Sequence, residues 1–359
     1  MKVLVASNLL AWDKPGGGET QVLRTLEFLK RKGIEIEYIS ADSVRKIRSF
    51  DIFHVFGVVH HLYDFLLYWK KELKRPSILT PLWWSPEEFY LHTNKLAYLK
   101  YKANTLLRRT LKKKWIQLQN VFDIRADIHG LMIYTADVIV TTSVMEKELL
   151  GREFGISPNK IEVVYNGVDE RFYYATPDLF VKKYGLKDFV LEVAAIHPKK
   201  NQLALITALM NKKDIPIVFI GPVINKYYYQ KCLKLAEKRG NVYFLGQIPH
   251  EDPLLASAYA AARVAVLPSW FDAPGLVALE AALAGTRVVI TNRGPMREYF
   301  NDLVFYINPN DLNDIEEKVL YAYYSSVDTT ILREHVRRNF TWDNVLEPLL
   351  KIYRRVLEE

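Results

Sequence analysis

Residues 267–280 read LPSWFDAPGLVALE. A strand ends near Leu267, a turn follows, and a helix begins after Gly275. In open sheets with helices on both faces, ligands bind where a strand ends and the next helix begins. The stretch therefore predicts an α/β fold and a ligand site at this turn.

Two carboxylates, Asp272 and Glu280, bracket this turn with seven residues between them. Free amides at a helix N-terminus hold phosphate through hydrogen bonds and the helix dipole. The two carboxylates can accept hydrogen bonds from sugar and ribose hydroxyls, so the pattern suits a sugar nucleotide. Glu280 lies in an otherwise apolar helix, where an unpartnered charge is costly to bury. We therefore interpret Glu280 as a functional residue rather than as half of a structural ion pair.

The same alternation of strand-length apolar runs with helical patterns continues through most of the chain, as in parallel sheets with crossover helices. The expected strands are 3–7, 35–40, 52–56, 77–80, 138–141, 189–194, 217–220, 243–245, 264–267 and 287–291, and the expected helices are 19–32, 202–210, 227–238 and 276–284. The alternation restarts after the turn NGVD at 166–169. At roughly 150 residues per domain, the chain length also predicts two doubly wound domains, which meet near residue 170.

Composition excludes several classes of protein. Half of the 359 residues are hydrophobic and a quarter are charged, which excludes disordered and fibrous chains. Cys232 is the only cysteine, so an intramolecular disulfide or a multi-cysteine metal site is excluded and a reducing cytoplasm fits best. The longest apolar run, 254–270, is interrupted by Arg263 and Pro268 and is too polar to span a membrane.

Positive charge is concentrated in residues 95–116, within a long helical insertion at about 85–131. This segment holds no acid and eight basic residues, namely Lys95, Lys100, Lys102, Arg108, Arg109, Lys112, Lys113 and Lys114. On a helix, one apolar stripe lies opposite most of these charges and consists of Leu96, Leu99, Ala103, Leu107 and Leu111. The stripe either faces the protein core or lies on an anionic membrane. Nucleic acid is not expected, because the basic footprint is confined to one patch.

Two further turns lie between a strand and a helix. The first, PGGGE at 15–19, lets backbone amides approach a ligand, but it matches neither the dinucleotide fingerprint nor a Walker motif. The second, AAIHPKKNQ at 194–202, carries two adjacent lysines. One of them could neutralise a departing diphosphate, although adjacent lysines in a loop are also common on a solvated surface.

The three turns in this order resemble the retaining glycosyltransferases of family 4, and the likeness covers nearly the whole chain. Other matching segments are VYNGVD at 164–169, FLG at 244–246, LAGTRVV at 283–289 and FTW at 340–342. The resemblance implies the GT-B fold, in which two Rossmann-like domains face a central cleft. It assigns residues 1–169 to an acceptor-binding domain, 170–341 to a donor-binding domain, and 342–359 to a helix that crosses back to the first domain.

The resemblance also implies roles for individual residues. Asp272 contacts the transferred sugar, Glu280 holds the ribose, and Lys200 binds phosphate, so these three form the catalytic set. The other donor-binding residues are the amides of Gly275 and Leu276 near the diphosphate, Gln247 and Ile248 near the base, and Gly16 and Gly17 of the first domain.

Several positions depart from the family pattern. Ala195 stands where the family usually has an arginine, and Pro274 has no amide to offer. His197 and Lys199 are expected to restore positive charge beside Lys200. The segment TPLWW at 80–84 lacks the histidine of many members, so Trp83 and Trp84 are expected to stack on an acceptor sugar.

The expected activity is therefore transfer of a sugar from a nucleotide-diphosphate donor to a glycan or lipid-linked acceptor, with retained configuration and without a metal or other cofactor. The departures leave two alternatives open, a non-catalytic carbohydrate-binding protein of the same fold and a sugar-nucleotide epimerase. The expected location is the cytoplasm, either free or peripheral on the inner membrane face through residues 95–116.

Overall fold

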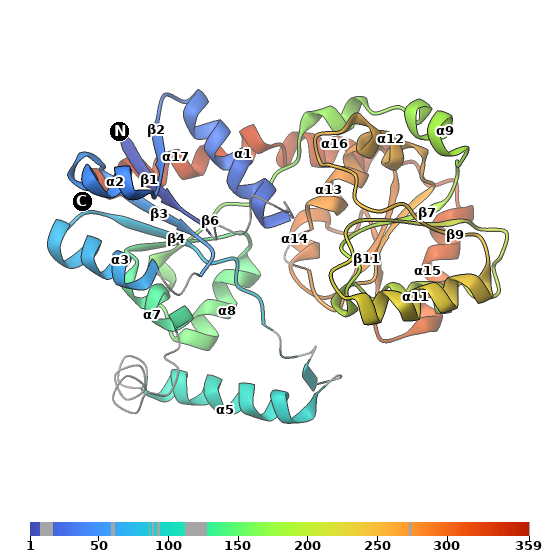
Figure 1. Cartoon of the computed structure of the whole chain (residues 1–359), viewed down its shortest axis with the longest axis horizontal. Helices are drawn as coiled ribbons and strands as arrows, with labels where there is room; N and C mark the ends of the chain where they lie inside the picture. Colours follow the sequence, from blue (N-terminus) through green and yellow to red (C-terminus); the bar gives the residue numbers. More distant parts are fainter. Residues whose placement is uncertain are drawn as a thin grey trace. The chain divides into compact units, whose positions relative to one another are not determined.

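The computed structural model describes residues 1–7, 17–58, 62–85, 87, 90–91, 94–111, 128–272 and 275–358. The chain divides into two compact units (Figure 1). Unit 1 comprises Met1–Asn166 and Trp342–Glu359, and unit 2 comprises Gly167–Thr341. The described residues of each unit form a six-stranded sheet with parallel strands. The expected α/β class, with two doubly wound sheets, is confirmed.

Unit 1 is built on a sheet with strand order β2-β1-β3-β4-β5-β6. Its strands are β1 (Lys2–Ala6), β2 (Glu35–Tyr38), β3 (Ile52–Phe56), β4 (Ser77–Thr80), β5 (Val138–Thr141) and β6 (Ile161–Val163). Its helices include α1 (Gly17–Arg31), α2 (Ala41–Arg45), α3 (Tyr63–Tyr68), α5 (Lys95–Leu111), α7 (Ile128–Thr135), α8 (Val144–Phe154) and α17 (Trp342–Glu358). The inner strands β3, β4 and β5 are buried along their whole length because helices cover both faces of the sheet.

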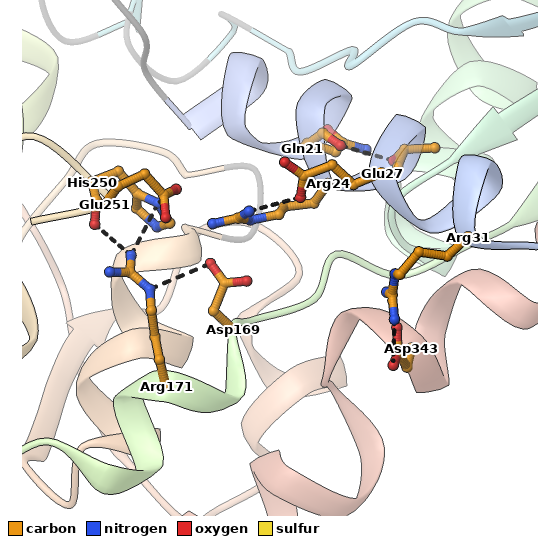
Figure 2. A network of polar contacts seen from close by, with 10 residues as sticks. Gln21, Arg24, Glu27, Arg31, Asp169, Arg171, His250, Glu251 and Asp343 are labelled. Atoms are coloured by element: carbon orange, nitrogen blue, oxygen red, sulfur yellow. Dashed lines mark hydrogen bonds and ion pairs between the residues drawn. The ribbon is translucent and has the colours of Figure 1, made fainter. Parts of the chain in front are cut away.

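The C-terminal helix α17 packs against α1 and buries one side in unit 1. Its Tyr353 hydroxyl shares a 2.6 Å hydrogen bond with His54 Nδ1 on β3, and His54 Nε2 lies 2.9 Å from Thr80 Oγ1. Complete burial lowers the pKa of His54 to about 3, so this histidine is neutral. At the exposed edge, Arg31 of α1 pairs with Asp343 of α17 (Figure 2).

Helix α5 contacts α8 through the side that carries Tyr101, whose hydroxyl donates to the Glu153 carboxylate. Of the two alternatives for the leucine stripe, packing against the core does not hold for Leu96 and Leu99, which are 77% and 62% exposed, whereas Leu107 of the same stripe is half-buried. The side of α5 that carries Tyr101, and not the side that carries Leu96 and Leu99, faces α8. The periodicity of a sequence shows which residues share a helix face, but it does not show which face contacts a neighbouring helix. Residues 112–114 lie outside the described residues. No helix in the described part of the chain is long and apolar enough to cross a bilayer.

Unit 2 has strand order β12-β11-β10-β7-β8-β9. Its strands are β7 (Val190–Val193), β8 (Ile217–Ile220), β9 (Val242–Phe244), β10 (Val264–Leu267), β11 (Arg287–Thr291) and β12 (Phe305–Ile307). Its helices include α9 (Asp178–Tyr184), α10 (Gln202–Ala208), α11 (Lys226–Arg239), α12 (Pro253–Ala261), α13 (Leu276–Leu283), α14 (Met296–Phe300), α15 (Leu312–Tyr324) and α16 (Thr330–Asn339). This order reverses between β7 and β10, which makes their carboxyl ends the topological switch point of the sheet.

Candidate active site

The switch point of unit 2 brings together two residues that are far apart in the sequence. Strands β7 and β10 are parallel neighbours, and the chain leaves them toward Lys200 and Asp272 respectively. Lys200 Nζ lies 2.6 Å from Asp272 Oδ1, with side-chain exposures of 26% and 10%. An ammonium and a carboxylate therefore meet at the edge of the sheet where ligands bind in this class of fold.

The loop that carries Lys200 is held by hydrogen bonds of its own residues. The Lys199 amide donates to His197 Nδ1 over 3.2 Å, which caps a short 3-10 helix at Pro198–Lys200. Asn201, buried and in the left-handed conformation, donates from Nδ2 to the carbonyl oxygens of Pro268 and Pro309. These bonds fasten the Lys200 loop to the end of β10.

His197 does not supply the positive charge that the sequence led us to expect. Burial lowers its pKa, and the charges of Lys199 and Lys200 lower it further, so the imidazole is neutral at pH 7. Because the ring is neutral, Nδ1 can accept a hydrogen bond from the Lys199 amide. The pKa of Lys199 is likewise lowered by burial and by Lys200.

Asp272 is buried, and its second oxygen, Oδ2, has no hydrogen-bond partner among the described residues. Its backbone carbonyl approaches Gly294 so closely that a Cβ there would lie 2.3 Å from the oxygen. Gly294 also has φ +86°, a conformation that favours glycine. A glycine after β11 thus allows the Asp272 turn to take its position. Ala273 and Pro274 lie outside the described residues.

Glu280 sits in α13, which begins at Leu276 after Gly275. It is only 5% exposed, and both of its carboxylate oxygens are hydrogen-bonded. Oε1 lies 2.9 Å from His250 Nε2, and Oε2 accepts from the Tyr259 hydroxyl over 2.7 Å. Glu280 is thus paired within unit 2 with His250 and Tyr259, so the structural pairing that we set aside on the sequence is present.

His250 lies between two carboxylates, Glu280 on its Nε2 side and Glu251 on its Nδ1 side, at 2.9 and 3.0 Å. Burial lowers the pKa of His250, but the hydrogen bonds to Glu280 and Glu251 outweigh it, so the pKa is raised. In the protonated form both ring nitrogens donate, and each carboxylate receives a hydrogen bond. Folding therefore favours the imidazolium form of His250, in which the ring offsets part of the charge that Glu280 buries.

Arg171 adds a second cation to this cluster (Figure 2). Its guanidinium donates to the backbone carbonyl of His250, and its Nε lies 3.8 Å from Asp169 Oδ2. Among the described residues, Asp169, His250 and Glu251 lie close enough to share a metal ion. A cation there would have to compete with Arg171, which already contacts two of these three residues.

We expect His250 to make the stability of the protein depend on pH. Because its pKa is raised on folding, its stabilising effect is complete below pH 6.5 and is lost as pH rises through the raised value. Over that window, one proton changes the free energy of unfolding by at most about 1.4 kcal/mol per pH unit. Urea unfolding of wild type and His250→Gln across this window measures the effect.

The His250→Gln variant keeps an amide donor for Glu280 but does not titrate, so its stability should lose this slope. His335→Gln, which changes a histidine of the same unit outside the cluster, is the matched control and should keep it. An identical slope in wild type and His250→Gln would contradict the assigned protonation of His250.

Glu192 is a further buried carboxyl of the switch point that the sequence analysis did not single out. It lies on β7 with 1% exposure, and its Oε1 accepts from Gln202 Nε2 over 2.9 Å. Burial raises the pKa of Glu192 well above its ordinary range, while the charge of Lys200 partly opposes that shift. The sequence signal that could have identified Glu192 is an acidic residue inside the otherwise apolar run FVLEV at 189–193.

The remaining expected site residues are spread over both units. Gln247 is exposed and Ile248 is 9% exposed in the segment after β9. In unit 1, Gly17 begins α1, whereas Gly16 lies outside the described residues. Trp83 packs edge-on against Phe154 and donates from Nε1 to Glu153, and Trp84 is half-buried.

Two family models match the chain, one mostly in unit 1 and the other within unit 2. The model described as Glycosyltransferase Family 4 matches residues 40–172, and the model described as Glycosyl transferases group 1 matches residues 180–339. Together they cover well over half of the 359 residues.

Curated relatives are similar at about a quarter identity. An uncharacterized glycosyltransferase of Methanocaldococcus jannaschii is 25% identical over 245 residues, which are 64% of this chain and 62% of that protein. Alpha-maltose-1-phosphate synthase of Mycolicibacterium smegmatis is 26% identical over 67% of this chain and 68% of its own length. The O-antigen chain mannosyltransferase B of Escherichia coli is 26% identical over 48% of each chain. The match with the Methanocaldococcus jannaschii protein spans less than two thirds of that protein's length.

Solved structures match the whole chain. Sucrose-phosphate synthase from Thermosynechococcus elongatus has a TM-score of 0.75 at 16% identity and covers 100% of both chains. Anabaena HepE, solved in complex with UDP and glucose, has a TM-score of 0.74 at 16% identity and covers 99% of this chain and 100% of its own. At this identity the likeness shows the fold, and the expected GT-B fold is confirmed. The chain belongs to the family 4, group 1 glycosyltransferases.

Proposed function

We propose that this protein transfers a hexose from a nucleotide-diphosphate sugar to a glycan or lipid-linked acceptor, with retention of configuration. The proposal rests on one observation, which is that Lys200, Asp272 and the start of α13 lie together at the switch point of unit 2. Unit 2 is the donor-binding unit in this proposal, and unit 1 binds the acceptor.

The charges at the switch point suit a diphosphate and a sugar. An ammonium has three N–H donors, and Asp272 takes only one from Lys200, so the others can reach phosphate oxygens. The free amides at the start of α13 favour the same anion through the helix dipole. Oδ2 of Asp272 then accepts from a hydroxyl of the transferred sugar.

The rest of the donor lies along α13 and the segment after β9. Each oxygen of Glu280 accepts one hydrogen bond within unit 2 and keeps a lone pair for the ribose hydroxyls. Gln247 and Ile248 meet the base. HepE was solved with UDP and with UDP-glucose, and this supports a uridine nucleotide among the donors to be tested.

Catalysis in this proposal is electrostatic. When the bond from the anomeric carbon to the diphosphate breaks, Lys200 and the α13 amides stabilise the charge that grows on the leaving oxygen. The acceptor oxygen bonds to the same face of the sugar, and its proton passes to the departing phosphate. The positive charge comes from the chain itself, so we propose that no metal is required.

The proposed location of the protein is the cytoplasm.

Nucleoside diphosphates are expected to stabilise the protein against heat. A ligand at 100 times its dissociation constant adds about 2.7 kcal/mol to the free energy of unfolding. Thermal unfolding is measured with UDP, GDP and ADP, each beside its monophosphate and inorganic phosphate. One diphosphate should raise the unfolding temperature more than its monophosphate does, and the difference should shrink in Lys200→Ala. If none of the three diphosphates shifts the transition, the proposed donor class is wrong.

A further inference from the structure

Helix α5 of unit 1 exposes an apolar stripe to solvent. Leu96 and Leu99 are 77% and 62% exposed, Leu106 is 63% exposed, and Ala103 is exposed as well. These positions are spaced three or four residues apart, so their side chains share one face of the helix. Contiguous exposed apolar surface on a protein marks an interaction site.

The opposite side of α5 is anchored to unit 1. Tyr101 donates to Glu153 of α8, and its hydroxyl also lies 2.9 Å from Ser85 Oγ. On the flank of the helix that also carries Lys95, Lys102 pairs with Glu87 over 2.7 Å. The leucine stripe is therefore the outward face of a helix that is held by its other side.

Lysines border the stripe on both sides. At 100° per residue, Lys95 falls on one side of the Leu96 and Leu99 face, and Lys100 falls on the other. Both side chains are exposed, and no acid occurs in residues 95–116. Long lysine stems place an ammonium beside phosphate groups while neighbouring leucines enter an apolar phase.

We propose that α5 docks unit 1 on an anionic lipid bilayer, with Leu96 and Leu99 in the boundary of the acyl chains and Lys95 and Lys100 on the lipid phosphates. Charge selects this occupant over a second copy of the chain, because pairing two α5 helices would bring together two segments that each hold five basic residues and no acid. Nucleic acid offers phosphates but no apolar phase for the leucines. The docking surface involves none of the donor-site residues, so it stands independently of the proposed activity.

Cosedimentation with vesicles tests the proposal. Vesicles of phosphatidylcholine with phosphatidylglycerol are compared with vesicles of phosphatidylcholine alone, at low and at high salt. Wild type should bind the anionic vesicles, and binding should weaken as salt screens the charges. Lys95→Glu/Lys100→Glu should lower the partition coefficient by about 25-fold or more, since each basic residue contributes roughly a fivefold factor. Leu96→Ser/Leu99→Ser should lower it by about tenfold or more.

Matched substitutions elsewhere control for charge and hydrophobicity. Lys231→Glu/Lys234→Glu on α11 makes the same change in net charge at two exposed lysines. Leu179→Ser/Ile331→Ser removes two apolar side chains that are 52% and 67% exposed in unit 2. Both control variants should bind anionic vesicles as wild type does. Circular dichroism checks that all four variants are folded.

Three results would overturn the proposal. The first is wild-type protein that stays in the supernatant with anionic vesicles at low salt. The second is a control variant that loses binding as fully as the α5 variants. The third is a wild-type dimer, measured by light scattering, that the Leu96→Ser/Leu99→Ser variant does not form, together with no vesicle binding by either protein. That result would assign the stripe to self-association. Vesicle binding is measured without sugar nucleotide, so its failure leaves the proposed activity untouched.

Discussion

Lys200→Ala is expected to lower the turnover of a nucleotide sugar by about 10²- to 10³-fold, the usual effect of removing one group that stabilises developing charge. The effect should be large because two neighbours in the same loop add no positive charge for the diphosphate, since Ala195 has no charged group and His197 is neutral. The loss should appear in kcat as well as in kcat/KM, since the charge on the diphosphate grows as the bond to the sugar breaks. Steady-state release of nucleoside diphosphate measures it.

Two further variants separate catalysis from folding. Lys199→Ala changes the adjacent lysine and should retain most of the turnover; if it is the more damaging change, Lys199 is the phosphate ligand. Lys200→Ala leaves Asp272 buried without its cation, so stability should fall too. The double variant Lys200→Ala/Asp272→Asn removes that charge, and it should recover stability without recovering turnover.

Truncation after Thr341 is expected to unfold unit 1. The cut removes α17, whose buried side chains are those of Trp342, Val345, Leu346, Leu349, Leu350, Ile352, Tyr353 and Val356. At roughly 1.5 kcal/mol or more for each, their burial contributes about 12 kcal/mol. That is comparable with the whole stability of a domain, about 5–15 kcal/mol. Hydrogen exchange should show amides of β1, β3 and β4 losing protection.

A point variant tests the same contact within the intact chain. Tyr353→Phe removes the hydroxyl that His54 contacts and should cost about 1–3 kcal/mol, because a buried ring nitrogen loses its partner. Lys351→Ala, an exposed position on the same helix, should have little effect. A truncated chain that keeps wild-type protection throughout unit 1 would contradict the assignment of α17 to its core.

The strands buried on both faces were the most predictable part of the fold. The bounds expected for 52–56 and 264–267 are those of β3 and β10, because continuous apolar runs stand out from their polar surroundings. Strands β6 and β12 were missed. Each is three residues long and lies at a sheet edge, although β9, equally short and at the other edge of the unit 2 sheet, was expected at 243–245.

The candidate site was predictable where its residues follow strands in the chain. Lys200 and Asp272 were both expected at a strand-to-helix turn, and the parallel pairing of β7 with β10 places them in contact. The partners of Glu280 were not predictable in this way. His250 precedes α12 and Tyr259 lies on it, and packing rather than sequence spacing brings them to α13.

The leucine stripe of α5 shows a different limit of sequence patterns. Spacing correctly placed Leu96 and Leu99 on one face, but it carries no information about which face meets α8. Tyr101 decides the orientation through its bond to Glu153, 52 residues away in the chain.

The proposed activity is tested most directly by release of nucleoside diphosphate from a panel of sugar nucleotides, by wild type and by Lys200→Ala. Product is measured by chromatography, with and without glycan and lipid-linked acceptors. Wild type should release diphosphate from at least one sugar nucleotide, faster with an acceptor, and release by Lys200→Ala should be about 10²- to 10³-fold slower. Folded wild-type protein that releases no diphosphate from any donor, or a variant that matches wild type, would refute the proposed transferase activity.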